Sequence, residues 1–282
     1  MEYTTLSNGV KMPMIGLGTW PLKGTALRSI VSMALDNGYN FFDTATGYGN
    51  EEDLGAALKG NETDVFIQSK VNQNTLIGRK RFLYLNKKSM TKAYEASRKK
   101  VGVCIIDSYL LHKPFTGCVK HYRELMRLQE AGEVRTVGVC NFDIDELKQL
   151  RNHCGVYPEV NQTEISVYNQ SSELVDFCQE HNIAVQGYSS FGRGNLVGEI
   201  LNNNLLKSIA SECGRSVGQV VLRWCVQRGI VCITRSTNPR HIKENIDVFS
   251  FYLTDSQMQK ISTMNSDRVF GVNQIGKRTV SL

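Results

Sequence analysis

The sequence contains no apolar run long enough to cross a membrane, because no stretch approaches the roughly 18 continuous apolar residues that such a helix needs. Its first residues, Met1 to Leu6, lack the basic and apolar segments of a secretory leader. Low-complexity tracts are missing, and 41% hydrophobic with 21% charged residues is an ordinary globular composition. These absences predict a soluble, cytoplasmic protein with no membrane partner.

Paired cysteine motifs are absent as well. Eight cysteines are scattered singly through apolar segments, and none has CxxC spacing, which predicts buried, reduced thiols and no metal site. Nucleic-acid-binding motifs are also missing, and the net charge of +6 is mild for 282 residues, so it favours anionic small molecules over nucleic acid. We expect a monomer or a weak homodimer.

The sequence does contain a regular alternation of short apolar runs and helical patterns. Eight strands are expected near 14–18, 40–43, 65–70, 106–112, 134–140, 159–162, 183–188 and 231–234. Helices are expected near 25–37, 50–59, 88–100, 117–131, 143–151, 171–181, 216–228 and 239–247. Eight such units predict one α/β domain over 1–282, a (β/α)8 TIM barrel. An open doubly wound sheet is the alternative, but no GxGxxG follows any expected strand.

Two further segments lie outside the alternation. Asn8-Gly9 is typical of a type I′ turn, so residues 4–12 are expected to form an N-terminal β-hairpin that plugs one end of the barrel. The chain from about 265 has no periodicity and is expected to be a C-terminal loop over the active-site mouth.

Four polar side chains follow the second, third and fourth expected strands. In a parallel barrel the carboxyl ends of all strands meet at one face, so Asp43, Lys70 and His112 are expected to be neighbours there, with Tyr48 folding back over them. A nearby ammonium lowers the pKa of a phenol. Lys70 is therefore expected to activate Tyr48 as a general acid, with Asp43 holding Lys70 and His112 orienting a substrate carbonyl.

Each of these residues also has a simpler structural interpretation. Asp43 could be a cap or turn residue, Tyr48 a packed amphipathic side chain, Lys70 a solvated charge, and His112 a histidine that is satisfied locally before Pro114. The coincidence of four suitable residue types at the ends of successive strands favours catalysis over these separate interpretations.

A second pattern follows the last expected strand. Asn238 is a good N-cap and Pro239 suits the first helical position, so a helix is expected to begin there. Helix N-termini attract phosphate, and Arg235, Ser236 and Arg240 add donors for it. A capped surface helix with ordinary arginines is the alternative.

The candidate residues and their surroundings, 68–70 and 107–112, resemble the catalytic tetrad of the aldo-keto reductases, and the resemblance extends from Gly16 to Asn245. It implies an enzyme of the alcohol dehydrogenase (NADP+) or aldehyde reductase type, which reduces an aldehyde or ketone with NADPH. Asn141 and Gln162 would hold the nicotinamide carboxamide, and Tyr188 would stack on the ring. The remaining cofactor contacts that the resemblance implies are Gly18, Thr19, Ser189, Phe191, Gly192, Arg193, Arg235, Ser236, Thr237, Arg240, Glu244 and Asn245.

The sequence departs from the family pattern at several positions. Relatives usually have Arg at Asn40, Ser at Cys140, Pro at Ser190 and Lys at Arg235. Arg235 keeps the positive charge, so phosphate binding is expected to persist. A thiol is a weaker hydrogen-bond donor than a hydroxyl, so the carboxamide contact next to Cys140 is expected to be looser.

The expected substrate side departs further. Trp20 remains, but many relatives have Trp where this chain has Lys113, and another aromatic residue where Val71 and Asn72 stand. Such a pocket is expected to suit anionic or polyhydroxylated substrates better than flat apolar aldehydes. The alternative is that Lys113 points to solvent.

Segment 79–88 mixes five positive charges with four apolar groups. It could be a flap over an anionic substrate, a membrane-surface patch or a partner site, but a solvated charged loop packed by its own aromatic residues is the favoured interpretation. No function is assigned to it.

Two other functions fit parts of the pattern. An NADPH-binding sensor or regulatory protein could keep the same fold with little turnover. A barrel aldolase could use Lys70 as a Schiff base, but this needs a lysine of lowered pKa, and Asp43 nearby opposes that shift.

Overall fold

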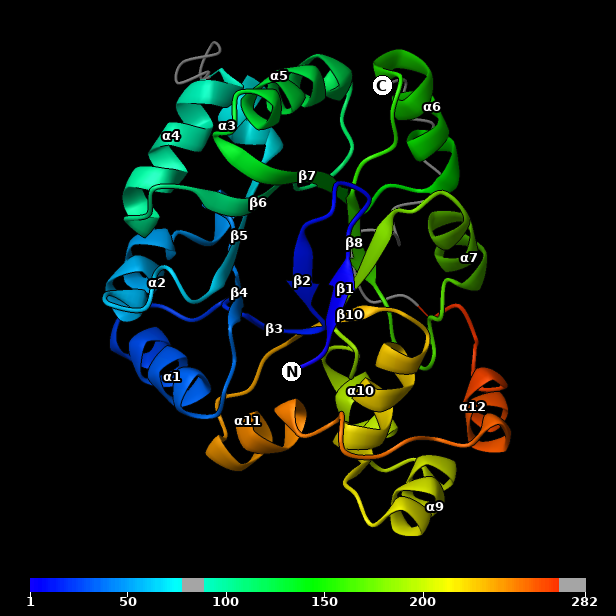
Figure 1. Cartoon of the computed structure of the whole chain (residues 1–282). Helices are drawn as coiled ribbons and strands as arrows, with labels where there is room; N and C mark the ends of the chain where they lie inside the picture. The colour runs from blue at the N-terminus through cyan, green and yellow to red at the C-terminus, as the bar shows by residue number, and fades with distance from the viewer. Residues whose placement is uncertain (78–88, 269–282) are drawn as a thin grey trace.

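The computed structural model describes residues 1–77 and 89–268, and its centre is a closed barrel of eight parallel strands (Figure 1). Neighbours in the chain are neighbours in the barrel, and the last strand closes the ring against the first. The strands are β3 (Ile15–Gly18), β4 (Phe41–Asp43), β5 (Phe66–Val71), β6 (Ile106–Leu111), β7 (Val134–Cys140), β8 (Val160–Glu164), β9 (Ala184–Tyr188) and β10 (Val231–Thr234). The (β/α)8 barrel is confirmed, and the open doubly wound sheet is excluded.

The barrel strands are buried on both faces because side chains fill the interior and helices cover the outside. Every residue of β5 and β6 is buried, including the polar Gln68 and Lys70. Strands that are buried on both faces are rich in apolar residues, which is why all eight could be predicted from the sequence. Gln68 and Lys70 lie inside the barrel, where buried polar groups need partners, whereas Ser69 faces outward and donates to Glu51 of α2.

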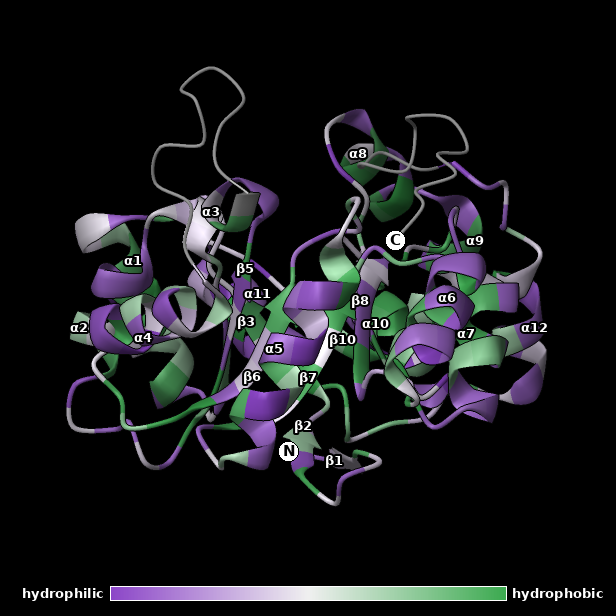
Figure 2. Cartoon of the chain, turned by 90° about the horizontal axis from the view of Figure 1, so that it is seen from above, coloured by the Kyte–Doolittle hydropathy of each residue, from purple (hydrophilic) through white to green (hydrophobic). Residues whose placement is uncertain are grey.

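The helices form an outer ring around the barrel (Figures 1 and 2). Their buried residues recur with helical spacing, as Leu27, Val31 and Ala34 do on the first helix. The predicted helices are α1 (Gly24–Asp36), α2 (Glu51–Leu58), α4 (Met90–Val101), α5 (Cys118–Glu130), α6 (Ile144–Cys154), α7 (Ser172–Glu180), α10 (Val217–Gln227) and α11 (Pro239–Ile246). Within residues 1–77 and 89–268, none is long and apolar enough to span a membrane.

Four helices were not predicted: α3 (Gln73–Ile77), α8 (Asn195–Leu201), α9 (Asn204–Cys213) and α12 (Asp255–Ser262). They are additional to the regular strand–helix alternation from which the other helices were predicted. Local signals were nevertheless present for two of them. Asn203 caps α9 through a hydrogen bond to the N–H of Leu206, and Thr254 with Gln257 forms a capping box at α12.

The N-terminal hairpin consists of β1 (Tyr3–Thr5) and β2 (Lys11–Pro13), which pair antiparallel. It lies at the barrel end opposite α3 and α8, where Met12 is fully buried and its sulfur accepts a hydrogen bond from Gln186 at 3.2 Å (Figure 2). The predicted plug is confirmed, but the turn type was wrong. A type I′ turn needs a positive φ at both of its central residues, but of Asn8 and Gly9 only Gly9 has one. The two strands are therefore joined by a longer loop that ends in a left-handed glycine.

The predicted C-terminal loop begins as expected, since residues 265–268 form neither helix nor strand. The backbone N–H groups of Ser266 and Arg268 both donate to the Tyr168 carbonyl at 3.1 Å. Arg268 also pairs with Glu199 of α8 at 2.8 Å. The rest of this loop, and the basic segment 79–88, lie outside the described residues.

Candidate active site

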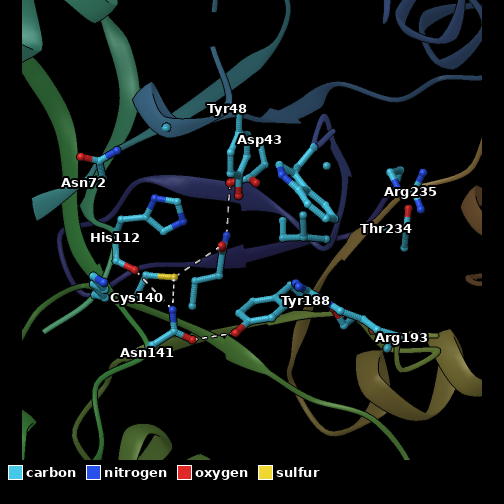
Figure 3. A pocket seen from close by; sticks show the side chains of 18 of the residues that line it. Asp43, Tyr48, Asn72, His112, Cys140, Asn141, Tyr188, Arg193, Thr234 and Arg235 are labelled. Atoms are coloured by element: carbon cyan, nitrogen blue, oxygen red, sulfur yellow. Dashed lines mark hydrogen bonds between the residues drawn. The ribbon is translucent and has the colours of Figure 1, made fainter. Parts of the chain in front are cut away.

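The four candidate catalytic residues meet at the carboxyl ends of three neighbouring strands. Asp43 ends β4, Lys70 lies in β5, and His112 directly follows β6. Tyr48 ends a short 3-10 helix, η1 (Thr46–Tyr48). The ring centroids of Tyr48 and His112 are 5.6 Å apart, and Lys70 Nζ lies 5.2 Å from the Tyr48 centroid (Figure 3). The structure therefore brings these four side chains together.

Lys70 and Asp43 form a buried ion pair below the phenol. Lys70 Nζ donates to the two carboxylate oxygens at 2.6 and 2.7 Å and to the Thr44 carbonyl at 2.9 Å. Burial lowers the pKa of Lys70, but the Asp43 carboxylate more than offsets this, so the pKa lies above its ordinary value. Lys70 is thus a permanent, fixed positive charge.

A cluster of glutamines supports this pair from inside the barrel, and the sequence analysis did not predict it. Gln68 and Gln162 donate to Asp43 Oδ1 at 2.7 and 3.2 Å. Gln186 Oε1 accepts from both of their amide groups at 2.8 Å, and its own amide donates to Gln68 at 2.9 Å. These bonds hold the Asp43 carboxylate in one orientation. The signal was a glutamine within each of three barrel strands, β5, β8 and β9.

Tyr48 differs from expectation in its acidity. Burial raises its pKa, and the Lys70 charge opposes that rise without cancelling it, so the pKa is about 12 instead of falling below its ordinary value of 10.0. The expected net lowering is wrong because the sequence does not show how deeply the phenol is buried. The consequence is that Tyr48 keeps its proton at neutral pH, as a proton donor must.

His112 is neutral over the same range. Burial, followed by the positive charges of Lys70 and Lys113, lowers its pKa from 6.5 to about 3. Its ring makes no hydrogen bond with the part of the chain that the structure describes, while its backbone N–H donates to the Val71 carbonyl at 3.0 Å. A neutral imidazole has one N–H that can donate to a substrate oxygen.

This lowered pKa has a measurable effect on stability. The unfolded chain binds a proton at His112 near pH 6.5 and the folded chain only near pH 3, so acidification between these values favours unfolding. From about pH 7 to about pH 5, His112 is expected to remove about 2 kcal/mol from the free energy of unfolding. Urea unfolding of wild type and His112→Gln at both pH values measures this, and an equal acid-induced loss in both proteins would contradict it.

Asn141, Cys140 and Tyr188 form the neighbouring wall. Asn141 accepts a hydrogen bond from the Tyr188 hydroxyl at 2.7 Å, and its amide donates to Cys140 Sγ at 3.2 Å. The Cys140 thiol donates a hydrogen bond to Gln162 Oε1 at 3.7 Å. Burial raises the pKa of this thiol to about 12. Asn141 is therefore held firmly, by a hydroxyl and a thiol, at the end of β7.

The loop after β9 carries a guanidinium over two aromatic rings. Arg193 lies 5.4 Å from the Tyr188 ring centroid and 5.5 Å from that of Trp20, and its Nε donates to Ser189 Oγ at 2.8 Å. Ser190 Oγ is buried and has no hydrogen-bond partner among the described residues. A positive charge beside an unsatisfied hydroxyl suits a phosphate-bearing ligand.

The segment after β10 has the predicted capped helix. Asn238 accepts a hydrogen bond from the backbone N–H of Arg240 at 2.9 Å, and Pro239 begins α11. Arg240 Nε pairs with Glu244 at 2.5 Å on the exposed side of the helix. Arg235 is exposed and makes no ion pair with the described residues. Of the two guanidinium groups near this helix N-terminus, that of Arg240 is paired with Glu244 and that of Arg235 makes no ion pair with the described residues.

One cavity of about 870 Å³ extends from the candidate catalytic residues to the loops that follow β9 and β10 (Figure 3). Of the predicted site residues, its wall includes Gly18, Trp20, Asp43, Tyr48, His112, Lys113, Asn141, Gln162, Tyr188, Ser189, Phe191, Gly192, Arg193 and Arg235. The wall does not include Lys70, Thr19, Ser236, Thr237, Arg240, Glu244 or Asn245. Lys70 lies beneath it, bound to Asp43. Thr19 is fully buried, and its hydroxyl accepts from Asn50 at 3.2 Å.

The fold and the cavity together indicate the kind of chemistry that this site can support. A (β/α)8 barrel holds a buried lysine–aspartate pair beneath a protonated phenol and a neutral imidazole. The same cavity extends to arginines of the last two barrel loops, where barrels commonly bind phosphate. Such a site suits proton transfer to a substrate oxygen next to a phosphate-bearing ligand. No group of three or more His, Cys, Asp or Glu that could hold a metal occurs within 1–77 and 89–268.

Comparison with known proteins identifies the family. The family model described as aldo/keto reductase family matches residues 14–266, and this chain belongs to that family. It is 37% identical over 272 residues to the 9,11-endoperoxide prostaglandin H2 reductase of Trypanosoma cruzi (strain CL Brener), covering 95% of this chain and 93% of that protein.

Two further relatives lie close in sequence or structure. The glyoxal reductase of Bacillus subtilis (strain 168) is 34% identical over 274 residues, which cover 95% of this chain and 94% of that protein. A crystal structure of an aldo-keto reductase complexed with NADPH superposes with a TM-score of 0.83 at 26% identity, covering 95% of this chain and 88% of that one.

Proposed function

We propose that this chain reduces an aldehyde or ketone to the alcohol by hydride transfer from NADPH, with Tyr48 as the general acid. One observation carries the proposal: Tyr48 and His112 line the cavity directly beside the buried Lys70–Asp43 pair. Carbonyl reduction needs a proton donor and a hydrogen-bond donor at one oxygen, and these two side chains supply both.

The cofactor fits the residues that are present. Arg193, Arg235 and the unsatisfied Ser190 hydroxyl provide partners for its phosphates, while Asn141 and Tyr188 form the wall beside the acid–base residues. Bound NADPH would supply the hydride. The relative crystallised with NADPH supports this assignment.

The side chains then divide the work at the substrate oxygen. His112 donates its N–H and fixes the direction of the carbonyl group. As the carbonyl carbon gains a hydride, the Tyr48 hydroxyl gives its proton to the oxygen, and the O–H bond of Tyr48 breaks. Lys70 stabilises the phenolate that remains, and Asp43 keeps Lys70 in place. A proton from solvent restores Tyr48.

A Schiff-base aldolase is disfavoured by the same geometry. Lys70 is fully buried, bonded to three oxygen atoms, and its pKa is raised, whereas a Schiff base needs a neutral amine. Borohydride in the presence of substrate should leave no covalent adduct. An NADPH-binding sensor remains the alternative, and tight binding without turnover would favour it.

Specificity for NADPH over NADH is expected to depend on the arginines near α11. Arg240→Ala should raise the Kd for NADPH roughly tenfold and leave that for NADH nearly unchanged, because only NADPH carries the 2′-phosphate. Binding the phosphate would replace an exposed ion pair with Glu244, which contributes little by itself.

Fluorescence titration with both cofactors measures this effect. Lys243→Ala is the matched control, because it removes an exposed charge from the same helix. Equal losses for NADPH and NADH in Arg240→Ala would remove the phosphate assignment.

A further inference from the structure

One positive charge in the cavity wall has no role in the proposed chemistry. Lys113 is half-buried, lines the cavity next to His112, and makes no hydrogen bond or ion pair with any residue in 1–77 or 89–268. A partly buried ammonium without a counterion on its own chain is a potential binding site for an anion.

The phosphates of the cofactor are poorly placed to be that anion. Lys113 follows β6, and in the closed barrel three strands separate β6 from β10 in either direction. Arg235 follows β10, and Arg193 follows β9. Figure 3 shows His112 and Asn72 on one side of the pocket and both arginines on the other. Lys113 thus lies across the mouth from the proposed phosphate side.

The neighbouring strand end adds an amide donor. Asn72 follows β5, and the pairing of Val71 with Leu111 places it beside His112. Its Oδ1 accepts from the backbone and the hydroxyl of Thr75 at 3.0 and 3.2 Å. These bonds fix the side chain with Nδ2 as a donor that has no partner among the described residues.

The charges of the wall leave this region positive. Asp43 is the only carboxylate lining the cavity within the described residues, and Lys70 already neutralises it. Gln73 and Asn74 continue the polar wall with neutral amides. One ammonium and a neutral amide donor match a single negative charge shared by two oxygen atoms, as in a carboxylate.

We propose that Lys113 and Asn72 form an anion subsite that selects carbonyl substrates bearing a carboxylate a few bonds from the reducible carbonyl. The carboxylate and the carbonyl are expected to be only a few bonds apart because Lys113 is next to His112 in the chain, and His112 would hold the carbonyl oxygen. This inference rests on the proposed function and adds a substrate class to it.

Succinic semialdehyde and its methyl ester test the subsite, because they differ chiefly in the charge of one end. In the wild type, kcat/KM is expected to be roughly ten- to a hundredfold higher for the acid. Lys113→Met should remove most of this preference by raising KM for the acid while leaving the ester unchanged. Lys113→Arg should keep part of the preference, and Lys120→Met is the exposed-lysine control.

Binding of succinate, which cannot be reduced, gives a readout without turnover. Trp20 lines the same cavity and is half exposed, so its fluorescence can report binding. Succinate should bind wild type and Lys120→Met, and roughly ten- to a hundredfold more weakly to Lys113→Met.

The outcomes separate this inference from the proposed function. Reduction of the ester as fast as the acid, or equal losses for both substrates in Lys113→Met, would overturn the subsite and leave carbonyl reduction intact. If no aldehyde is reduced, the proposed function fails, and succinate binding then decides the subsite alone. Binding that depends on Lys113 would support an anion site, and binding that is indifferent to Lys113 would overturn it.

Discussion

Tyr48→Phe is expected to lower kcat for carbonyl reduction by about 10²–10⁴-fold, the usual contribution of a general acid. The phenol is the proposed proton donor, and its pKa of about 12 keeps it protonated at neutral pH. Phenylalanine retains the ring beside His112 but has no proton to give. The Kd for NADPH is expected to stay nearly the same, since the change removes one hydroxyl on the substrate side.

Steady-state rates of NADPH oxidation and a fluorescence titration measure the two quantities. Tyr252→Phe is the matched control, because Tyr252 is 69% exposed and lies outside the cavity wall. A Tyr48→Phe enzyme that keeps most of its rate would contradict the mechanism. One that loses NADPH binding to the same extent as turnover would show that Tyr48 acts through the cofactor instead.

Lys70→Met is expected to have the second large effect, on stability as well as on rate. Removing the ammonium leaves Asp43 as a buried carboxylate whose charge is not compensated, which costs about 3–5 kcal/mol. The raised pKa of Lys70 means that its stabilising charge is fully present at neutral pH and is lost only as pH rises through that value. Turnover should fall because the phenolate of Tyr48 loses its positive neighbour.

Chemical unfolding at neutral pH and NADPH oxidation measure this variant, with Lys99→Met as an exposed control. Adding Asp43→Asn to Lys70→Met is expected to restore part of the stability, since no unpaired charge is then buried, but not the activity. A Lys70→Met protein as stable as the control would show that the ion pair contributes little to the fold.

The sequence was sufficient to predict the barrel because short strand candidates, most of them largely apolar, alternate with amphipathic helical patterns. The placement of Asp43, Lys70 and His112 followed from the topology alone, since parallel strands deliver their carboxyl ends to one face. Helices α8, α9 and α12 were missed because they add to the repeating pattern instead of belonging to it.

Other features of the site depend on burial and three-dimensional packing, which a linear pattern does not contain. The expected pKa of Tyr48 had the wrong direction because the nearby charge was visible in the sequence and the depth of burial was not. The bonds among Gln68, Gln162 and Gln186 join residues up to 118 positions apart in the chain. Only the closed barrel brings those amides to one level beneath Asp43.

The central claim is that this chain reduces carbonyl compounds with NADPH, and one experiment tests it most directly. The purified protein is titrated with NADPH, and NADPH oxidation is then followed with a panel of aldehydes, aldoses and keto acids. We expect the protein to bind NADPH and to oxidise it in step with formation of the alcohol. Binding without oxidation of NADPH by any carbonyl compound would contradict it and favour a sensor.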